Sequence, residues 1–397
     1  MRVAFLANKY LDPRRSGSWS GLPYFIRRAL EDAGVETSLI WCEDRHRMAC
    51  WVQFFYWRIR HRRRYLRYCN ERLLQGYARQ IERRLASAPP ADAVFSVSTW
   101  LLAFLRTDLP TVLYTDACFS ALLGFYESFS NLAPASVFEG HLVERLALNR
   151  CSRVIYSTSW AARAAQDAYD VDPAKTHVVF YGAGFHDPPD PADVAALIRA
   201  RNPASCSLLL VGVDWKRKGA DVAVAAVSAL QARGCNARLT IVGCRPPPGR
   251  TLPPFVEVIP FLDKETAEGR RQLHRLYRRS HFFILPSRAE ASAVVFSEAG
   301  AYGLPSLASE VGGLSSIIVN NLNGRLFSAD APGEAYADYL LALVRNPLRY
   351  RALARQSLEE SVSRLSWKVS GPRLAEILGE AVRRRTEMPP VAAVRRA

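Results

Sequence analysis

Two glutamates in the second half of the chain have a spacing that could place both on one ligand. Glu290 lies in a loop of small residues after an apolar run that ends at Leu285, and Glu298 follows after seven intervening residues. If a helix starts near Ser292 or Ala293, Glu298 stands about two turns along it, and both carboxylates can project toward one crevice. A carboxylate accepts two hydroxyl hydrogen bonds at once, which suits the vicinal diol of a ribose or another sugar. The simpler interpretation is a solvated helix residue and a loop N-cap.

A basic cluster follows another apolar run in the same half of the chain. The run Ser207–Val211 leads into Gly212, and Arg217 and Lys218 stand just before an amphipathic helical stretch. A lysine binds phosphate as a point charge, an arginine can fork onto two oxygens, and the amides at a helix N-terminus also attract anions. These features predict a phosphate site, although a basic cluster is often a solvated face. The glycine after the next run, Gly243, is a weak signal by itself.

Short apolar runs alternate with amphipathic helical stretches along the chain, which predicts an α/β fold with parallel sheets. Strands that are covered on both faces of a parallel sheet should be continuously apolar, and these runs mostly are. The predicted strands are Val3–Ala7, Ala93–Val97, Thr111–Tyr114, Val154–Tyr156 and His177–Phe180 in a first series, and Ser207–Val211, Leu239–Val242, Val256–Ile259, Phe282–Leu285 and Pro305–Ala308 in a second series.

A Pro- and Asp-rich stretch at residues 185–191 separates the two series, and we place the domain boundary near residues 186–205. We therefore expect two doubly wound, Rossmann-like domains at residues 1–190 and 205–365. A C-terminal helix and tail at residues 366–397 should follow, with the helix packing back on the first domain. Because ligands of open α/β sheets bind outside the carboxyl ends of the strands, the residues just after each strand are the ones to examine.

The charge balance favours anionic partners. The chain of 397 residues carries 53 Lys and Arg against 37 Asp and Glu, a formal net charge of +16. Charge alone does not choose among nucleotide diphosphates, acidic lipid surfaces and nucleic acid. No run approaches the ~20 apolar residues that span a bilayer, and the eight cysteines lack zinc-ligand spacing. We expect a cytoplasmic protein with reduced thiols.

Further motifs surround these residues in a specific order. They are the Lys218-Gly219 pair, then Leu285-Pro286-Ser287, Glu290, Glu298, Gly303-Leu304-Pro305, Val311-Gly312-Gly313 and Asn323-Gly324-Arg325-Leu326-Phe327. This ordered set resembles the retaining glycosyltransferases of family 4, and weaker similarity covers most of the chain. The resemblance implies a GT-B fold, in which two Rossmann-like domains face each other across a cleft.

The resemblance also implies a reaction and a set of roles. The reaction is the transfer of a sugar, with retention of configuration and without a metal or other cofactor, from a nucleotide-diphosphate sugar to an acceptor hydroxyl. The acceptor would be a saccharide, or a lipid-linked or polysaccharide precursor. Glu290 would contact the transferred sugar, Glu298 would hold the ribose, and Lys218 would neutralise the diphosphate. Further donor contacts would come from Gly17, Gly212, Arg217, Gly243, Ala291, Ser292, Ala293 and Val294.

Two departures from the family pattern leave an alternative open. Val213 stands where the family usually has an arginine, so Arg217 or Lys216 would have to supply the second cation. Ala291-Ser292-Ala293 stands where the family often has Gly-Phe-Gly, and glycine would allow a closer approach of the backbone to a ligand. The alternative is a non-catalytic GT-B protein that binds a nucleotide or a sugar.

The first half of the chain carries fewer candidates. Residues 16–21 resemble the family's loop that closes on the donor phosphates, although such a loop can also be a simple turn. Asp116, at the end of the strand Thr111–Tyr114, is the candidate for the position beside the reacting sugar where family members commonly have a histidine; a helix N-cap is equally compatible. Asp170 and Asp172 have the letters of a metal-binding D-x-D motif, but their surroundings predict a helix end and a turn.

Residues 51–85 mix arginines with aromatic residues at helical spacing. This composition is typical of a helix on an anionic membrane surface, which would suit a lipid-linked acceptor and a peripheral location on the inner face of the membrane. The alternative is a solvated basic helix whose aromatic residues pack on the domain. We expect no nucleic-acid partner, because no RNA- or DNA-binding motif accompanies the patch.

Overall fold

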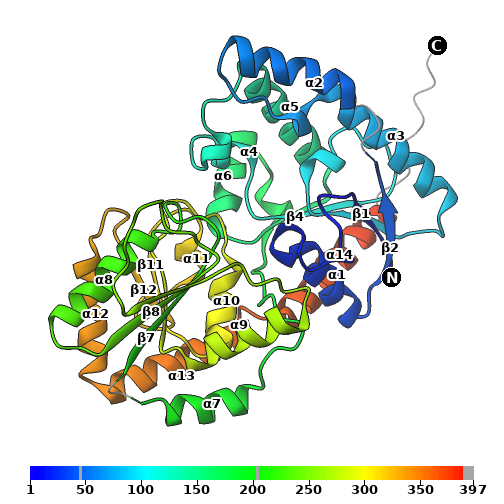
Figure 1. Ribbon diagram of the computed structural model, residues 1–397. Helices are drawn as coiled ribbons and strands as arrows, with labels where there is room; N and C mark the ends of the chain where they lie inside the picture. Colours follow the sequence, from blue (N-terminus) through cyan, green and yellow to red (C-terminus); the bar gives the residue numbers. More distant parts are fainter. Residues whose placement is uncertain (44–46, 203–204, 388–397) are drawn as a thin grey trace, which may run out of the picture.

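The computed structural model describes residues 1–43, 47–202 and 205–387, and these residues form two α/β lobes (Figure 1). The N-terminal sheet has the parallel strand order β2 (Glu36–Trp41), β1 (Arg2–Ala7), β3 (Ala93–Ser96), β4 (Thr111–Thr115), β5 (Arg153–Tyr156), β6 (Thr176–Val178). The C-terminal sheet has the parallel order β12 (Gly324–Phe327), β11 (Ser306–Ser309), β10 (Phe282–Leu285), β7 (Cys206–Val211), β8 (Ala237–Val242), β9 (Val256–Ile259). The predicted α/β fold with two doubly wound parallel sheets is confirmed.

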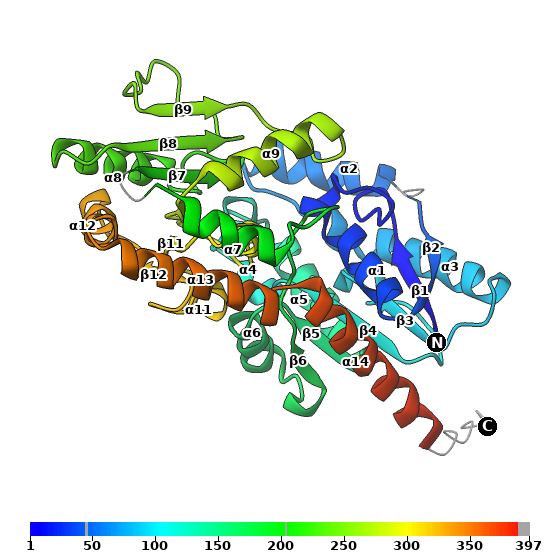
Figure 2. The same ribbon diagram turned by 90° about the horizontal axis from the view of Figure 1, so that it is seen from below.

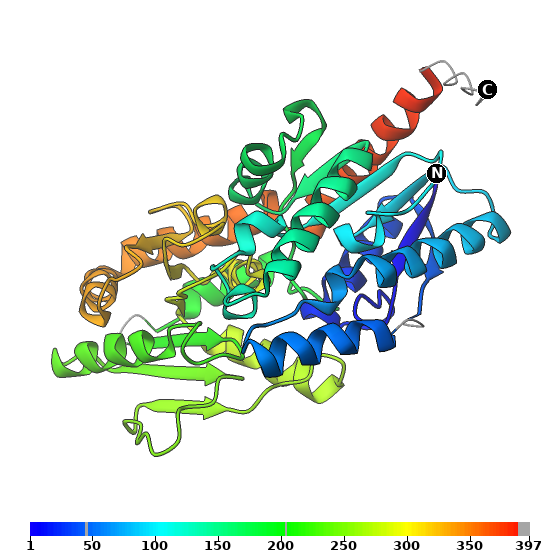
Figure 3. The same ribbon diagram turned by 90° about the horizontal axis from the view of Figure 1, so that it is seen from above.

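Helices connect the strands and pack around both sheets (Figure 3). Those of the N-terminal lobe are α1 (Leu22–Asp32), α2 (Arg47–Phe55), α3 (Glu71–Ser87), α4 (Phe119–Leu122), α5 (Pro134–Arg150) and α6 (Ser159–Tyr169). The later helices are α7 (Pro191–Ala200), α8 (Ala220–Ala232), α9 (Ala267–Arg279), α10 (Val294–Ala301), α11 (Leu314–Ile317), α12 (Gly333–Val344), α13 (Pro347–Ser363) and α14 (Trp367–Glu387).

Two edge strands, β2 and β12, are not predicted from the sequence. In β2 the sequence is half polar and Ile40 is the one buried residue, while β12 begins with Gly324 and contains Arg325. An edge strand has a neighbour on one side alone and is less covered by helices. The continuous apolar pattern that identifies a central parallel strand therefore does not apply to these two.

In each sheet the strand order reverses at one point. The C-terminal sheet grows outward from β7 through β8 to β9, and then from β10 through β11 to β12 on the other side. Because β7 and β10 are neighbours whose chains leave in opposite directions, a crevice opens between the loops at their carboxyl ends. In the N-terminal sheet the corresponding point lies between β1 and β3.

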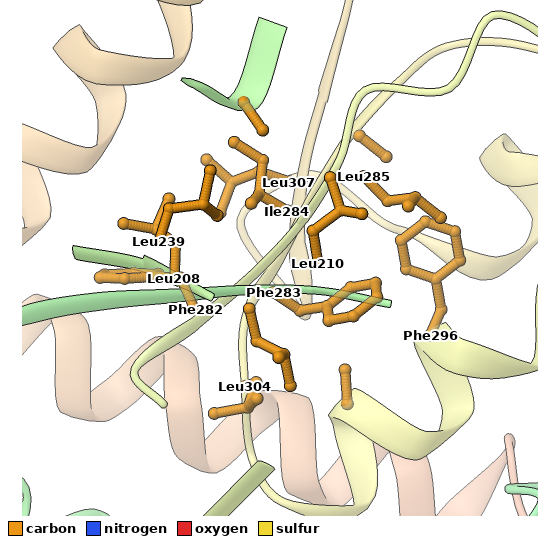
Figure 4. Packing of buried hydrophobic residues seen from close by; sticks show 14 of the residues in the cluster. Leu208, Leu210, Leu239, Phe282, Phe283, Ile284, Leu285, Phe296, Leu304 and Leu307 are labelled. Carbon is orange, nitrogen blue, oxygen red and sulfur yellow. The ribbon is translucent and has the colours of Figure 1, made fainter. Parts of the chain in front are cut away.

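Apolar side chains hold these strand ends in place. Figure 4 shows part of the C-terminal core, in which Leu208 and Leu210 of β7 pack with Phe283 of β10 and Phe296 of α10. All four side chains are buried. The loops that carry the candidate residues therefore start from well-packed positions, as a preorganised site requires.

A helix follows the Pro-rich stretch within the predicted boundary region at residues 186–205. Asp190 caps the N-terminus of α7 by accepting a hydrogen bond from the Ala192 amide at 2.7 Å. Val194 and Ile198 of this helix are buried in the C-terminal core. The chain that enters the second lobe therefore packs with it from α7 onward.

The last helix returns to the N-terminal lobe. It continues from α13 and runs beside α1, so it crosses from one lobe to the other (Figure 2). Leu374, Ile377 and Leu378 of α14 are fully buried in the N-terminal core. The expected packing of the C-terminal helix on the first domain is confirmed, and residues 388–397 of the predicted tail lie outside the described residues.

Residues 51–85 do not form the single helix that their spacing suggests. A π-helical turn at Tyr56–Arg60 follows α2, and Arg62 then has a φ of 51°, which interrupts the helix. The Arg64 amide donates instead to the Asn131 carbonyl at 2.9 Å. This pairing with the loop before α5 competes with helical hydrogen bonding, so the next α-helix is α3, after a short 3₁₀ helix at Arg67–Cys69.

Shortening a buried side chain of α14 should destabilise the protein. Ile377→Ala removes apolar atoms from the N-terminal core and should lower the free energy of unfolding by about 2–5 kcal/mol. Val369, on the same helix, is 40% exposed, so Val369→Ala should cost less than about 1 kcal/mol. Denaturant titration followed by tryptophan fluorescence measures both changes. Equal effects of the two substitutions would contradict the docking of α14 in the core.

Candidate active site

A cleft of about 680 Å³ lies between the two lobes. Its walls come from the loop before α1 and the loop after β4 in the N-terminal lobe, and from the loops after β7, β8, β9 and β10 in the C-terminal lobe. The predicted residues that line it are Gly17, Asp116, Gly212, Arg217, Lys218, Gly243, Glu290, Ser292, Ala293, Val294 and Glu298. The side chain of the remaining candidate, Ala291, is fully buried away from the lining. The candidates after β7 and β10 thus meet at the point where the strand order reverses.

Lys218 and Glu290 form an ion pair within the cleft. The Lys218 ammonium donates to Glu290 Oε2 at 2.5 Å. Arg217 Nη1 approaches the same oxygen at 3.4 Å. Lys218 and Glu290 are 8% and 6% exposed, and limited contact with water strengthens their attraction. Two cations meet at this carboxylate, and Arg217 Nε also lies 4.0 Å from Asp214 Oδ2, so both cations are held beside the space of the cleft.

Two glycines and an aspartate shape the loop that carries these cations. Asp214 Oδ1 accepts a hydrogen bond from the Arg217 amide at 2.8 Å, which fixes the turn before α8. A Cβ atom on Gly212 would lie 2.8 Å from Lys218 Cγ, so this glycine leaves the space that the lysine occupies. Gly243 has a φ of 85°, in the left-handed region that favours glycine, and a Cβ there would meet the Gly212 carbonyl at 2.4 Å. The strand ends can therefore approach the lysine closely.

Glu298 lies on α10 and lines another part of the same cleft. Its Oε2 accepts a hydrogen bond from the Tyr277 hydroxyl at 2.7 Å, and its Oε1 is paired with the Lys264 ammonium. The side chain is fully buried, and burial of a carboxylate is costly without such partners. A Cβ on Gly184 would lie 2.8 Å from Oε1, so the chain between the lobes passes directly over the carboxylate.

The start of α10 faces the cleft without a side-chain cap. The helix begins at Val294, and Ser292 and Ala293 before it line the cleft. The first amides of a helix lack intrahelical partners and carry partial positive charge, so this end attracts an anion. The Ala291 amide is different, because it donates to the Tyr126 hydroxyl of the N-terminal lobe at 2.7 Å.

The loop before α1 joins the two lobes beside the cleft. The Gly17 amide donates to Glu265 Oε1 at 3.1 Å, and Arg15 Nη2 pairs with Glu265 Oε2 at 2.8 Å. Glu265 belongs to the loop after β9 in the C-terminal lobe. The loop with Gly17 is therefore held against the opposite lobe, as a loop that closes a cleft would be.

Asp116 follows β4 and lines the cleft from the N-terminal lobe. Burial raises the pKa of Asp116 to about 6, with a further rise from the charge of Glu290, while its own amide and that of Ala117 oppose the shift. A carboxyl group with this pKa can exchange a proton near neutral pH. The helix N-cap interpretation of Asp116 is wrong, because α4 starts later, with Cys118 as its N-cap.

Several cleft residues were not predicted from the sequence, among them Lys264 and Tyr126. Lys264 comes soon after the predicted strand Val256–Ile259, so the rule that ligands bind after strand ends could have found it. Tyr126 meets Ala291 across 165 positions of sequence, and no local pattern predicts such a contact.

The structure also shows where the alternative cations and the D-x-D motif lie. Arg217 lines the cleft together with Val213, whereas Lys216 is exposed outside the lining. Asp170 ends α6 with a φ of 54°, and Asp172 Oδ1 accepts a hydrogen bond from the Ala174 amide at 2.8 Å. The D-x-D letters therefore mark a helix end and a turn, as predicted.

Solved structures establish that the chain has the GT-B fold, two Rossmann-like domains around a cleft. Sucrose-phosphate synthase from Thermosynechococcus elongatus matches with a TM-score of 0.67 at 15% identity, over 96% of this chain and 98% of that chain. HepE from Anabaena, solved in complex with UDP and glucose, matches with a TM-score of 0.61 at 15% identity, over 96% of this chain and 99% of its own.

Family models match both lobes. The model described as Glycosyltransferase Family 4 matches residues 24–183, and the model described as Glycosyl transferases group 1 matches residues 205–346. The chain belongs to this glycosyltransferase family. The D-inositol 3-phosphate glycosyltransferase of Segniliparus rotundus is 29% identical over 257 residues, which are 62% of this chain and 55% of the relative. The chain thus spans about half the length of that curated relative.

The raised pKa of Asp116 predicts how stability changes with pH. The folded protein binds the proton of the Asp116 carboxyl group more tightly than the unfolded chain does. The contribution of this proton to the free energy of unfolding is therefore complete below the ordinary pKa of 3.8, and it is lost as pH rises through about 6. Asp116→Asn should therefore raise the free energy of unfolding at about pH 7.5 by about 1–3 kcal/mol, and by much less near pH 4. Thermal denaturation at both pH values measures the difference. A shift of the same size at both would contradict the raised pKa.

Proposed function

We propose that the protein transfers a sugar from a nucleotide-diphosphate sugar to an acceptor hydroxyl, with retention of configuration and without a metal ion. The observation that carries the proposal is the meeting of Lys218, Glu290 and Glu298 in one buried cleft at the strand-order reversal. Family membership supports the reaction type. The complex of HepE with UDP and glucose supports a nucleotide-sugar donor.

In the proposed mechanism, cations of the cleft stabilise the leaving diphosphate. Lys218 and Arg217 both pair with the Glu290 carboxylate, and Arg217 also pairs with Asp214, so these cations are held in fixed positions in the cleft. The uncapped start of α10 adds partial positive charge beside them. As the glycosidic bond breaks, negative charge grows on the departing diphosphate, and preorganised positive groups stabilise it.

The two carboxylates bind hydroxyl groups on either side of the diphosphate. Glu298 has acceptor capacity left beyond its bonds to Tyr277 and Lys264, and it would hold the ribose diol. Glu290 would contact the transferred sugar, held in position by its ion pair with Lys218. A ligand that donates hydrogen bonds to these oxygens therefore binds to carboxylates that the protein already holds in position.

The proposed step breaks the bond between the anomeric carbon and the diphosphate oxygen and forms a bond from the anomeric carbon to the acceptor oxygen on the same face. The acceptor proton passes to the departing phosphate oxygen, so the products are the glycosylated acceptor and the nucleoside diphosphate. Asp116, across the cleft, would accept a hydrogen bond from the transferred sugar or from the acceptor hydroxyl.

Removal of the Lys218 charge should weaken nucleotide binding and slow transfer. A thermal-shift screen against UDP, GDP, ADP and their sugars first identifies the base. Lys218→Ala loses a charge-assisted hydrogen bond of about 1.5–3 kcal/mol, so the Kd of the matching nucleoside diphosphate should rise about 10- to 100-fold by isothermal titration. Lys216→Ala is the matched control, because that lysine is exposed outside the cleft lining. Glu298→Gln should weaken binding in the same direction.

Equal affinities for Lys218→Ala and Lys216→Ala would remove the site assignment. Nucleotide binding without turnover of any donor and acceptor pair would favour the non-catalytic alternative, to which Val213 and residues 291–293 point. The anomeric configuration of the product, measured by NMR, tests retention separately.

We also propose that the segment Arg47–Arg60 binds an anionic membrane surface. It lies on the outer side of the N-terminal lobe (Figure 1), and no helix in the described part of the chain has the length and apolar character to cross a bilayer. Four apolar residues of this segment have at least half of their surface exposed: Val52, Phe55, Tyr56 and Ile59. Arg58 and Arg60 are exposed beside them. Exposed apolar groups next to arginines suit the interface of an anionic bilayer.

Replacing exposed apolar side chains of this segment should weaken binding to vesicles. Phe55→Ser with Ile59→Ser should lower partitioning onto phosphatidylglycerol vesicles by about tenfold or more, since each side chain loses burial in the interface. Leu348→Ser with Val362→Ser, at exposed positions on α13, is the control and should bind as the unmodified protein does. Co-sedimentation measures both. The membrane proposal fails if the two double variants bind alike, or if neutral phosphatidylcholine vesicles bind the protein equally well.

A further inference from the structure

A second cavity, of about 340 Å³, adjoins the cleft from within the N-terminal lobe. The two cavities share four lining residues: Trp19, Asp116, Leu122 and Phe129. Asp116 therefore stands at their junction. A molecule in this second cavity would meet whatever the cleft holds at Asp116.

The second cavity also lies at a strand-order reversal. Its walls include Tyr10 and Leu11, which follow β1, and Ser98 and Thr99, which follow β3. These strands are the neighbours at which the N-terminal sheet changes direction. The cavity thus has the position in which open α/β sheets bind ligands, and its volume is in the range of small-molecule sites.

Two buried polar atoms of the cavity lining lack a hydrogen-bond partner among the described residues. They are Glu144 Oε1 and Ser98 Oγ. Glu144 is 4% exposed, and its other oxygen accepts a hydrogen bond from the Thr99 hydroxyl at 3.0 Å. Burial raises the pKa of Glu144 to about 7, while the Thr99 hydroxyl and the Phe119 amide oppose the shift. Because unsatisfied buried polar atoms are costly, these two are best explained by a ligand with hydroxyl groups.

The remaining walls are aromatic. Trp100 lies at the centre of a group of rings, 6.3 Å from Tyr10 and 5.9 Å from Tyr68 between centroids. All three residues line the cavity. Flat aromatic surfaces combined with a few polar groups suit a ring that has both C–H faces and hydroxyl edges.

The charges around this cavity disfavour an anion. Its lining contains two carboxyl groups, Asp116 and Glu144, and no lysine, arginine or histidine is part of that lining within the described residues. Lys9 lies over the Tyr10 ring at 4.7 Å, on an exposed part of the chain. The His141 and Phe119 rings meet edge to face, and burial lowers the pKa of His141, so this histidine is neutral at physiological pH. A phosphate placed here would meet like charge and no partner cation.

We infer that Glu144 and Ser98 select an uncharged, polyhydroxylated ring, a neutral saccharide unit, as the acceptor. The inference rests on the proposed glycosyltransferase function and adds the class of acceptor. It separates this chain from relatives whose name specifies a phosphorylated inositol. Glu144 and Ser98 would bind acceptor hydroxyls, and Asp116 would stand beside the hydroxyl that reacts.

Pairs of a neutral ring and its phosphorylated counterpart test directly whether the cavity prefers an uncharged ligand. Saturation-transfer NMR with the matching nucleoside diphosphate present would compare methyl glucoside with glucose 6-phosphate, methyl mannoside with mannose 6-phosphate, and myo-inositol with myo-inositol 3-phosphate. The inference expects contact to at least one neutral member and at least tenfold weaker binding of its phosphorylated partner. Preference for a phosphorylated member, or binding of none of the six, would overturn it. Failure of the protein to bind any nucleoside diphosphate would count against the proposed function instead.

Variants then test the two residues. Glu144→Gln and Ser98→Ala should each raise the Kd of the neutral probe about 5- to 10-fold and leave the Kd of the nucleoside diphosphate unchanged. Glu139→Gln is the matched control, because Glu139 lies on the same helix, outside the cavity lining, and accepts a hydrogen bond from Tyr65. An effect of the same size in Glu139→Gln, or no effect in Glu144→Gln, would show that Glu144 serves packing rather than selection.

Discussion

Paired charge that is shielded from water is the feature on which the cleft depends. Lys218 is bound to Glu290, and Glu298 is bound to Lys264 and to the Tyr277 hydroxyl. A buried charge without a partner is costly, so each carboxylate is held in one place by the cation or hydroxyl beside it. A nucleotide sugar has the complementary groups, an anionic diphosphate between two rings with hydroxyls. The same pairs that satisfy the protein can therefore orient the donor.

The strand order of the two sheets determines where these ion pairs lie. In the C-terminal lobe the reversal between β7 and β10 brings Lys218 and Glu290 together, although 72 positions separate them in the chain. In the N-terminal lobe the reversal between β1 and β3 opens the cavity that contains Glu144. Asp116, after β4, lines both the cleft and this second cavity. In the proposed reaction the C-terminal lobe supplies the charges for the leaving group, and the cavity of the N-terminal lobe supplies carboxyl and hydroxyl groups that bind acceptor hydroxyls.

Much of this could be predicted because it follows local rules. Buried central strands are continuously apolar, and charged residues directly after them converge at a sheet edge, so Lys218 and Glu290 could be placed in one crevice. The edge strands β2 and β12 lack this apolar pattern and were missed, whereas the edge strands β6 and β9 were predicted. The contact of Tyr126 with Ala291 depends on how two lobes meet. Glu144 could not be found either, because it lies mid-helix and only the folded cavity shows that its Oε1 lacks a partner.

A crystal structure of the protein with its matching nucleoside diphosphate tests the central claim most directly. The account predicts the diphosphate within hydrogen-bond distance of Lys218 and the start of α10, and the ribose hydroxyls on Glu298. Density for the nucleotide in another cavity would contradict the account. So would a nucleotide in the cleft that makes no contact with Lys218 and Glu298.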